Sequence, residues 1–413
     1  MKLLLTLWLV VLSVSVFSQD IVEWRGPGRL GIYPDKNLLK VWPEKGPKLL
    51  LELNNIGNGY SSPVVYGQNI FVSGRKDTMD VIAAYTADGT KKWETAYGRA
   101  WMRSFPETRC TPTIENNRIY LVSGMGEVVC LDVLSGKVLW KVDAQTTFKG
   151  EPHRWGIAES VAISDKAVFY VTGGEETSVI ALDKTDGKLL WKTKSLGGTR
   201  AYASSVVIEK AGLKMLLAQT ANDLMAINTV NGEIVWSFSL IPYHKGETGV
   251  GANTNTPLYV DSKIFITSGY DHPAILLNLA DDGRSVSVKW TNPDFDNHIG
   301  GVVKVGDSVY GSNWTNNTQG NWVCVDWNSG KTLYETKWFN KGPVISADGM
   351  LYCYEEKSGN LALVKPGTEK FEVVSSFKVD KGSGPHWAHP SIFDGKLYVR
   401  HGESLMVYDL KNI

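Results

Sequence analysis

The chain has 413 residues, with 43 lysines and arginines against 43 aspartates and glutamates, so its formal net charge is zero. This balance provides no attraction to nucleic acids or to anionic membranes, and we expect neither as a partner. The 15 Trp, 17 Tyr and 41 Gly residues are typical of a sheet protein with many tight turns and aromatic contacts.

The first residues predict export. Residues 1–19 combine Lys2, an apolar run from Leu3 to Val16 and a polar end, which is the pattern of a cleavable signal peptide. No later stretch approaches about 18 continuous apolar residues, so we expect no transmembrane segment. The mature protein is therefore expected in the periplasm or outside the cell, as a monomer.

Residues 20–46 are predicted to be an N-terminal extension lying over the rim or one face of a single repeat domain, residues 47–413. The repeat places a small residue, Asp or Asn, Gly and Trp at fixed spacing. Its clearest copies are Ala181/Asp183/Gly187/Trp191, Cys130/Asp132/Gly136/Trp140, Ala226/Asn228/Gly232/Trp236 and, with tyrosine last, Cys324/Asp326/Gly330/Tyr334. Asp or Asn bonds the backbone ahead of a tight turn, and Gly takes the positive φ that the turn needs. The Trp is expected to pack against the neighbouring repeat, with the small residue making room for it.

Eight segments read as the first strand of a repeat. They begin at Ser61, Thr111, Glu159, Ser204, Asn255, Gly300, Gly342 and His389. Successive motif aromatics lie 44 to 54 residues apart, close to the blade period of about 40 to 50 residues in β-propellers. The last repeat has no room for a fourth strand, and we expect residues 47–53 to supply it and close the ring.

This motif resembles the tryptophan-docking motif of the PQQ-like (quinoprotein-type) β-propeller repeats, which eight-bladed periplasmic assembly factors share. The segment from Trp24 to Gly31 also resembles one that precedes such repeats. The resemblance implies an all-β, eight-bladed propeller of four-stranded antiparallel blades, and because the motif belongs to the scaffold it implies little about function.

Four cysteines, Cys110, Cys130, Cys324 and Cys353, would suggest disulfides in an exported chain. Cys130 and Cys324 occupy the small-residue position of the motif. Burial as small apolar groups is therefore the preferred interpretation.

The loops that precede the first strands are expected to converge on one face around the central channel. They are rich in Arg, His and aromatic residues, which favour an anionic or sugar-like ligand. The ligand-binding candidates are Arg103, Arg109, His153, Arg154, Trp155, Arg200, Tyr202, His298, Trp314, His386, Trp387 and His389. The structural alternative is that these side chains cap the channel by stacking and by ion pairs with Glu107, Glu151 and Glu159.

We expect no metal site, since His386 and His389 have no identifiable third ligand. We expect no cofactor. PQQ with calcium, which the resemblance suggests, is disfavoured because the sequence has no adjacent cysteine pair and no Asp-rich calcium pattern. The leading functional hypothesis is a non-catalytic binding or scaffold module for an envelope protein or a ligand. The alternatives are carbohydrate binding or cleavage by the Arg/His/Trp loop face, and PQQ-dependent oxidation of alcohols or sugars.

Overall fold

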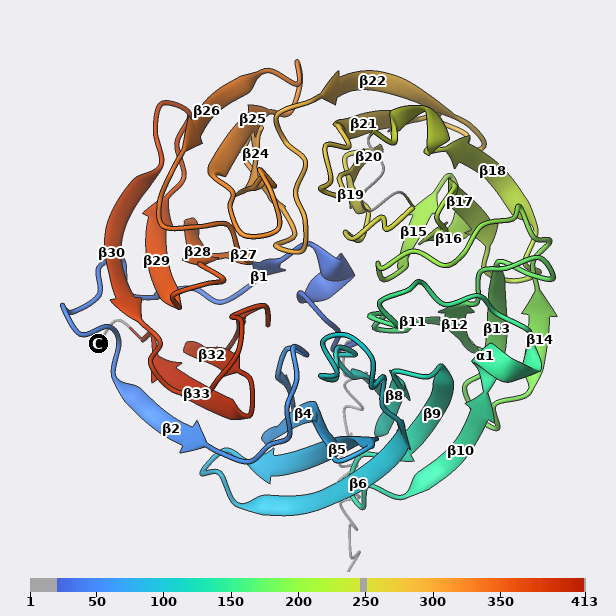
Figure 1. Cartoon of the computed structure of the whole chain (residues 1–413), viewed down its shortest axis with the longest axis horizontal. Coiled ribbons are helices and arrows are strands. Elements are labelled where there is room, and N and C mark those ends of the chain that lie inside the picture. The colour runs from blue at the N-terminus through green and yellow to red at the C-terminus, as the bar shows by residue number, and fades with distance from the viewer. Residues whose placement is uncertain (1–20, 246–250, 412–413) are drawn as a thin grey trace, which may run out of the picture.

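The computed structural model describes residues 21–245 and 251–411, and these form eight sheets arranged around a central channel (Figure 1). Each sheet contains a blade of four antiparallel strands running from an inner strand at the channel to an outer strand at the rim, and the sheet of blade 7 has a fifth strand, β1 (Ile32–Tyr33), beside its inner strand. The predicted eight-bladed all-β propeller is confirmed.

The strands of the first four blades follow one another from the channel outward. Blade 1 contains β3 (Val64–Tyr66), β4 (Asn69–Lys76), β5 (Met79–Thr86) and β6 (Lys91–Arg99). Blade 2 contains β7 (Thr113–Glu115), β8 (Arg118–Val122), β9 (Glu127–Asp132) and β10 (Val138–Asp143). Blade 3 contains β11 (Ala162–Ser164), β12 (Ala167–Val171), β13 (Val179–Asp183) and β14 (Leu189–Lys192). Blade 4 contains β15 (Val206–Lys210), β16 (Leu213–Gln219), β17 (Asp223–Asn228) and β18 (Ile234–Ser239).

The remaining blades have the same order. Blade 5 contains β19 (Leu258–Val260), β20 (Lys263–Ile266), β21 (Ala274–Leu279) and β22 (Val286–Asn292). Blade 6 contains β23 (Val303–Val305), β24 (Ser308–Ser312), β25 (Trp322–Asp326) and β26 (Thr332–Thr336). Blade 7 contains β27 (Val344–Ala347), β28 (Met350–Tyr354), β29 (Asn360–Lys365) and β30 (Glu372–Lys378). Blade 8 contains β31 (Ser391–Phe393), β32 (Lys396–His401), β33 (Ser404–Asp409) and β2 (Leu49–Leu53). The short helices are η1 (Pro27–Arg29), α1 (Ala144–Thr147) and η2 (Ile241–Tyr243).

The repeated motif joins each blade to the next. In blade 3, Trp191 lies opposite Ala181, and its indole Nε1 donates a hydrogen bond to the carbonyl of Thr229 in blade 4, at 3.1 Å. Gly232 of blade 4 has φ 75° and lies against the same ring, so close that an added Cβ would be 2.5 Å from an indole carbon. Corresponding indole bonds join the blades of Trp93, Trp140, Trp236 and Trp290 to the following blade. The motif is therefore a docking unit in which the Trp of one blade contacts the turn of the next.

A second set of hydrogen bonds joins the blades near the channel. The residue two positions before an inner strand accepts, through its hydroxyl, a bond from the backbone N–H of the preceding blade. The series runs from Ser62 to Thr111 (2.9 Å), from Thr111 to Ser160 (3.0 Å), from Ser160 to Ser204 (2.9 Å) and from Ser204 to Thr256 (3.2 Å). We call it the hydroxyl belt. In blades 6, 7 and 8 the same position holds Gly301, Gly342 and His389, none of which has a hydroxyl.

The ring closes in blade 8, where β2 pairs antiparallel with β33, with Leu53 opposite Leu405. The predicted closure by residues 47–53 is confirmed. Both ends of the chain thus contribute to one blade, and no blade is left with three strands.

The first part of the N-terminal extension, through β1, lies in the channel, which was not expected. Trp42 instead lies over blade 7 and donates its backbone N–H to Ser375 of the outer strand β30, in agreement with the expected position over a face or the rim. η1 and the short β1 (Ile32–Tyr33) are at the centre of the ring in Figure 1, and β1 pairs parallel with the inner strand β27. Arg29 donates to the carbonyls of Ser160 and Val161 in blade 3. The extension crosses the channel and contacts blades on opposite sides, where Arg25 and Arg29 donate to carbonyls at or just before the inner strands.

The four cysteines are buried and free, in agreement with the interpretation as small apolar groups. Cys130 lies opposite Trp140, and Cys324 opposite Tyr334. Burial raises the pKa of the Cys130 thiol to about 11, so it carries no charge at neutral pH.

Candidate functional site

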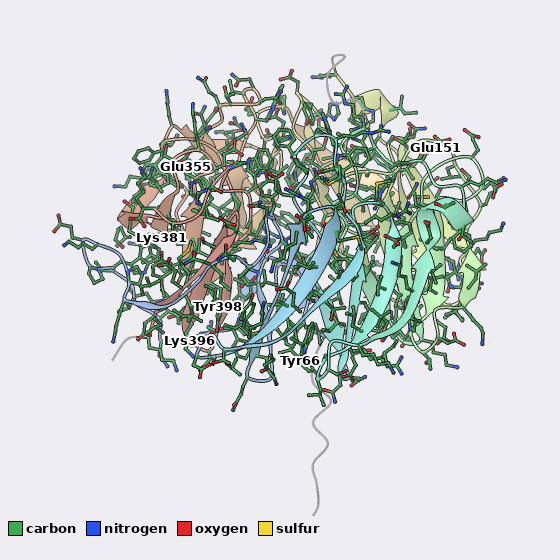
Figure 2. The ribbon with its side chains drawn as sticks, turned by 60° about the horizontal axis from the view of Figure 1, so that its bottom comes forward. Tyr66, Glu151, Glu355, Lys381, Lys396 and Tyr398 are labelled. Carbon is green, nitrogen blue, oxygen red and sulfur yellow. The ribbon has the colours of Figure 1, made fainter. Side chains whose placement is uncertain are left out.

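The loops that connect successive blades lie on one face of the disc, which we call the loop face. The turns between the second and third strands of each blade, such as the β28–β29 turn, lie on the same face. Figure 2 shows Glu151 and Glu355 on this side and Tyr66 and Lys396 on the opposite side. A cavity of about 360 Å³ opens among the described residues of the loop face, above the N-terminal segment that crosses the channel. Seven of the predicted candidates line it, namely Arg109, Arg154, Trp155, Tyr202, His298, Trp387 and His389.

One wall of the cavity is an aromatic cluster around Trp387. The ring of Trp387 lies 4.9 Å from that of Tyr60 and 5.0 Å from that of Phe105, measured between centroids. The Trp387 indole donates to Glu356 at 3.0 Å, and Glu356 is paired with Lys341 at 3.0 Å. Because its N–H is bonded behind the wall, Trp387 presents only its aromatic surface to the cavity.

The opposite wall is built around Trp155. Its ring is stacked on Tyr270 at 5.8 Å and 20°, and it meets the edge of Tyr202 at 6.3 Å. The guanidinium carbon of Arg154 lies 4.6 Å from the Trp155 ring centre, a cation–π arrangement. The two walls leave a space bounded by flat aromatic surfaces.

The two arginines of the cavity lining differ in whether their guanidinium groups are already bonded to the protein. Arg109 donates to the carbonyls of Trp155 (2.8 Å), Ser104 (3.1 Å) and Phe105 (2.5 Å). It therefore ties the loop after blade 1 to the loop that carries Trp155. Arg154 is exposed and, among the described residues, has no carboxylate within ion-pair distance, so it can bind an anion.

The two histidines of the lining are neutral. Burial, with the charge of Lys341, lowers the pKa of His298 to about 3, and burial with the charge of Arg25 lowers the pKa of His389 to about 3. His298 Nε2 is bonded to the Tyr270 hydroxyl at 2.9 Å. At neutral pH the fixed positive charge of the lining therefore comes from its arginines.

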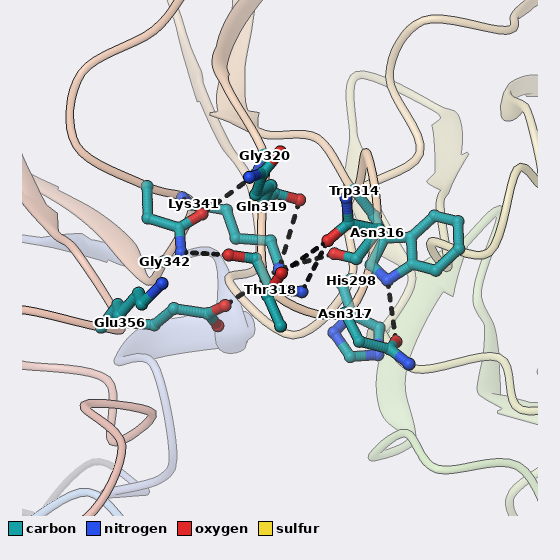
Figure 3. Close-up of polar contacts among 12 residues, drawn as sticks. His298, Trp314, Asn316, Asn317, Thr318, Gln319, Gly320, Lys341, Gly342 and Glu356 are labelled. Atoms are coloured by element: carbon teal, nitrogen blue, oxygen red, sulfur yellow. Dashed lines mark hydrogen bonds and ion pairs between the residues drawn. The ribbon is translucent and has the colours of Figure 1, made fainter.

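A loop of blade 6 contributes Asn317 to the cavity lining, and Figure 3 shows the polar contacts of this loop. Lys341 donates to the carbonyls of Asn316 (2.9 Å) and Gln319 (3.3 Å), and the Trp314 indole donates to the Asn317 side chain at 3.1 Å. Asn317 reaches the cavity lining, and Trp314 packs 5.2 Å from Tyr270 behind it. Lys341 thus fixes the loop by donating to backbone carbonyls of the loop.

Five predicted candidates do not line the cavity. One of them is Trp314, which packs against Tyr270 as described above. Arg103 is exposed and lies over Trp101, at 5.3 Å from the ring centre. His153 is buried against Trp155, with 4.7 Å between ring centroids. Arg200 is fully buried and paired with Glu159 at 2.6 Å, and its guanidinium also bonds the Tyr170 hydroxyl, which is the structural alternative for an arginine of these loops.

His386 is the fifth of these candidates. It is buried, its Nδ1 is 2.5 Å from the Tyr354 hydroxyl, and its ring stacks on His401 at 3.6 Å. His389, three positions later, instead contacts Arg25 and the carbonyl of Ile299. The two imidazoles thus have separate partners. Within residues 21–245 and 251–411, no group of three or more His, Cys, Asp or Glu side chains is arranged to hold a metal ion.

Four aromatic residues of the lining were not among the candidates: Trp24, Tyr60, Phe105 and Tyr270. Tyr60 lies just before an inner strand, and Phe105 lies in a loop already expected on this face, so position alone could have suggested both. Tyr270 lies in the loop between β20 and β21, and Trp24 lies in the extension, and neither segment was expected to reach a binding site.

A family model described as "Outer membrane protein assembly factor BamB" matches residues 78–333, more than half of the chain. The BamB of Yersinia pestis is 27% identical over 154 residues, which cover 37% of this chain and 37% of that protein. The quinoprotein alcohol dehydrogenase PedH of Pseudomonas putida is 25% identical over 160 residues, covering 37% of this chain and 26% of the dehydrogenase. The matched part thus spans well under half the length of either curated relative.

Solved structures share the fold at lower identity. BamB from Moraxella catarrhalis superposes with a TM-score of 0.63 at 13% identity, covering 88% of this chain and all of that one. A europium-containing methanol dehydrogenase superposes with a TM-score of 0.65 at 13% identity, covering 91% of this chain and 88% of that one. No helix among the described residues is long and apolar enough to cross a membrane. With its propeller fold similar to both groups and the family model matched over most of its blades, the chain belongs to the PQQ-like β-propeller family described by the outer membrane protein assembly factor BamB.

Proposed function

We propose that this protein is a non-catalytic binding module of the cell envelope, and that its loop-face cavity takes a sugar-like ligand. The observation that carries the proposal is the cavity itself, which encloses about 360 Å³ between two aromatic walls and admits polar groups at its edges. Flat aromatic surfaces with a few polar groups are typical of sites that stack a sugar or another ring. The signal-peptide pattern and the name of the BamB relative support an envelope location.

Binding is favoured over cleavage by the chemistry of the lining. Hydrolysis of a glycosidic bond ordinarily needs two carboxyl groups flanking that bond. The described residues of the lining include arginines, histidines and hydroxyl groups but no Asp or Glu. The cavity can therefore hold a sugar ring without supplying the acid and the base for its hydrolysis.

The quinoprotein relatives suggest PQQ with calcium as an alternative, and the residues of this chain do not fit that pair. Calcium takes six to eight oxygen ligands, among which carboxylates are prominent. The described cavity lining has no carboxylate, and the extension with Arg25 occupies the channel beneath it. These residues therefore support no oxidation step through this cofactor.

Protein binding is a second candidate, which the BamB relative favours by its name. Met102, Phe105 and Phe339 are 47%, 52% and 58% exposed, respectively, in loops of the cavity face. Exposed apolar side chains gathered on one face are typical of docking surfaces. A reduced amount of folded outer membrane proteins in cells lacking this chain would support this candidate, and unchanged amounts would contradict it.

Calorimetry of the mature protein against neutral and acidic saccharides tests the ligand proposal. We expect Trp155→Ala to weaken binding about tenfold, because loss of one stacking ring costs roughly 1.4 kcal/mol. Phe393→Ala is the control, since Phe393 is an aromatic residue, 43% exposed, at the end of β31 on the opposite face. Absence of binding to every saccharide, or equal loss in both variants, would contradict the proposal.

A further inference from the structure

The floor of the cavity is made by the N-terminal segment that crosses the channel. Trp24 belongs to the cavity lining, and its ring meets the edge of His389 at 5.1 Å. Arg25, the next residue, is only 3% exposed and lies beneath both of them. The segment therefore contributes one residue to the cavity surface and one charge directly below it.

Arg25 contacts three neighbouring blades of the ring. Its guanidinium donates to the carbonyls of Val302 (2.6 Å) and Val344 (3.0 Å), and bonds His389 Nδ1 at 2.8 Å. These contacts belong to blades 6, 7 and 8, the three blades without a belt hydroxyl. A Cβ added to Gly301 would overlap the guanidinium, so glycine is needed there for Arg25 to fit. Gly301 and the carbonyls thus hold the positive charge of Arg25 at a fixed place below the cavity.

The charge of Arg25 has no carboxylate partner among the described residues. Arg29 on the same segment is paired with Glu23 at 2.8 Å, and the buried Arg200 is paired with Glu159. Burial lowers the pKa of Arg25 to about 10, which still leaves it protonated at neutral pH. A buried charge without an opposite charge is costly, and an anion bound nearby would offset that cost.

His389 lies between Arg25 and the cavity, but both of its ring nitrogens are already hydrogen-bonded, so neither is free to bind a ligand. Because a guanidinium can only donate, His389 Nδ1 accepts from Arg25, and Nε2 carries the proton that it donates to the carbonyl of Ile299 at 2.9 Å. Two carboxylates lie behind the aromatic wall: Glu356, paired with Lys341, and Glu107, whose charge adds to burial in raising the pKa of Tyr60. Of the arginines in the described part of the lining, Arg154 is the one without a hydrogen-bonded or ion-paired partner.

We propose that the cavity selects ligands that carry a negative charge next to a ring, such as an acidic sugar, and that the buried Arg25 sets this selectivity from beneath the floor. The inference rests on the proposed function and adds the class of ligand. Arg154 makes the direct contact with the anion, Trp155 and Trp387 hold the ring, and Arg25 supplies a positive potential that solvent screens less than that of an exposed charge.

Two matched probes test the proposal: p-nitrophenyl β-D-glucuronide and p-nitrophenyl β-D-glucoside, which differ only in a carboxylate against a hydroxymethyl group. Equilibrium dialysis, read by nitrophenyl absorbance, gives both affinities. We expect the intact protein to bind the glucuronide at least tenfold more tightly. Arg25→Met should reduce that ratio to about threefold or less, whereas Arg25→Lys, which keeps the charge, should preserve most of it.

The control is the double variant Glu23→Gln/Arg29→Met. It removes a buried arginine with two carbonyl contacts from the same segment, together with its carboxylate, so the net charge stays the same. The selectivity ratio should not change. An equal loss of selectivity in the control and in Arg25→Met would overturn the role of the Arg25 charge.

The outcomes separate the two proposals. If the intact protein binds neither probe and no saccharide in the calorimetry, the proposed function fails. If it binds neither probe but binds another saccharide, the function stands and the inference fails. If it binds both equally, the function stands and the charge selectivity fails. If Arg25→Met does not fold, the variants Arg25→Lys and Arg154→Gln decide. A folded Arg25→Lys that no longer prefers the glucuronide would refute the inference. So would Arg154→Gln, at an exposed position, if it kept the full preference for the glucuronide.

Discussion

Replacing Gly232 by alanine tests whether the motif turn is a docking surface for the preceding blade. Gly232 has φ 75°, and a Cβ at this position would lie 2.5 and 2.8 Å from two carbons of the Trp191 indole. The indole cannot simply withdraw, because its N–H is bonded to the carbonyl of Thr229. The turn of blade 4 and the ring of blade 3 must therefore separate.

Gly212 provides the matched comparison within the same blade. Its φ is 74°, nearly the same, but a Cβ there would meet no heavy atom within 4 Å. An L-residue in this left-handed conformation costs about 1–2 kcal/mol, and both variants carry that cost. Only Gly232→Ala adds an overpacking term of roughly 1–3 kcal/mol. We expect Gly232→Ala to be less stable than Gly212→Ala by about 2 kcal/mol.

Urea unfolding followed by tryptophan fluorescence measures the difference as a shift of the midpoint at unchanged slope. The emission should also change more in Gly232→Ala, since the Trp191 environment opens. Equal midpoints for the two alanine variants would refute the reasoning, because they would mean that blade docking tolerates the extra methyl group.

Two further predictions concern buried ionisable groups. Arg400 is fully buried and donates to the carbonyls of Gly57 and Ser73 among others, so Arg400→Met should lower the free energy of unfolding by about 3 kcal/mol, whereas the exposed Arg103→Met should change it by less than about 0.5 kcal/mol. Comparable urea midpoints for these two variants would contradict the structural role of Arg400. His298 has a folded-state pKa of about 3 against an ordinary value of 6.5, so the unfolded chain binds more protons between these values and stability falls as the pH is lowered through that window. In His298→Gln the slope of the free energy of unfolding against pH should therefore fall by about one proton, roughly 1.4 kcal/mol per pH unit, which unfolding measured from about pH 7 to about pH 4.5 can detect. An unchanged slope of this free energy would show that His298 does not titrate in this way.

The blades could be predicted from the sequence because their determinants are local. Asp183, Gly187 and Trp191 lie within nine residues, and the turn and the strands that they specify are formed by the same stretch. Ring closure was also predictable, since counting strands left blade 8 one short and residues 47–53 were the apolar segment free to fill it.

The path of the extension could not be predicted in this way. The hydrogen bond from Arg25 to Val344 joins residues 319 positions apart, and its partner is a backbone carbonyl, which every residue has. The sequence of the segment contains no sign of which carbonyls its arginine reaches. The space for the guanidinium becomes evident only in the folded ring, where Gly301 is seen to leave room for it.

The candidate residues divide according to the direction of each side chain, which loop composition does not specify. Arg154 and Arg200 are both arginines of neighbouring loops, yet one is exposed beside the cavity and the other is fully buried. The difference lies in Glu159, which offers Arg200 a charge inside blade 3. Predicting it would have required knowing that the two side chains meet.

The crossing of the channel by the extension affects the order in which this protein can fold. Arg25 and β1 dock on inner strands of blades 6 to 8, and β2 docks on β33, so both N-terminal elements bind surfaces formed by residues beyond 300. Contacts this distant in sequence are slow to form because a long loop must close first. We therefore expect these elements to stay solvated until the final blades have formed, so that the last step of folding both closes the ring and withdraws Arg25 from water. The loop-face cavity, whose floor is this segment, is therefore expected to be complete only in a closed ring.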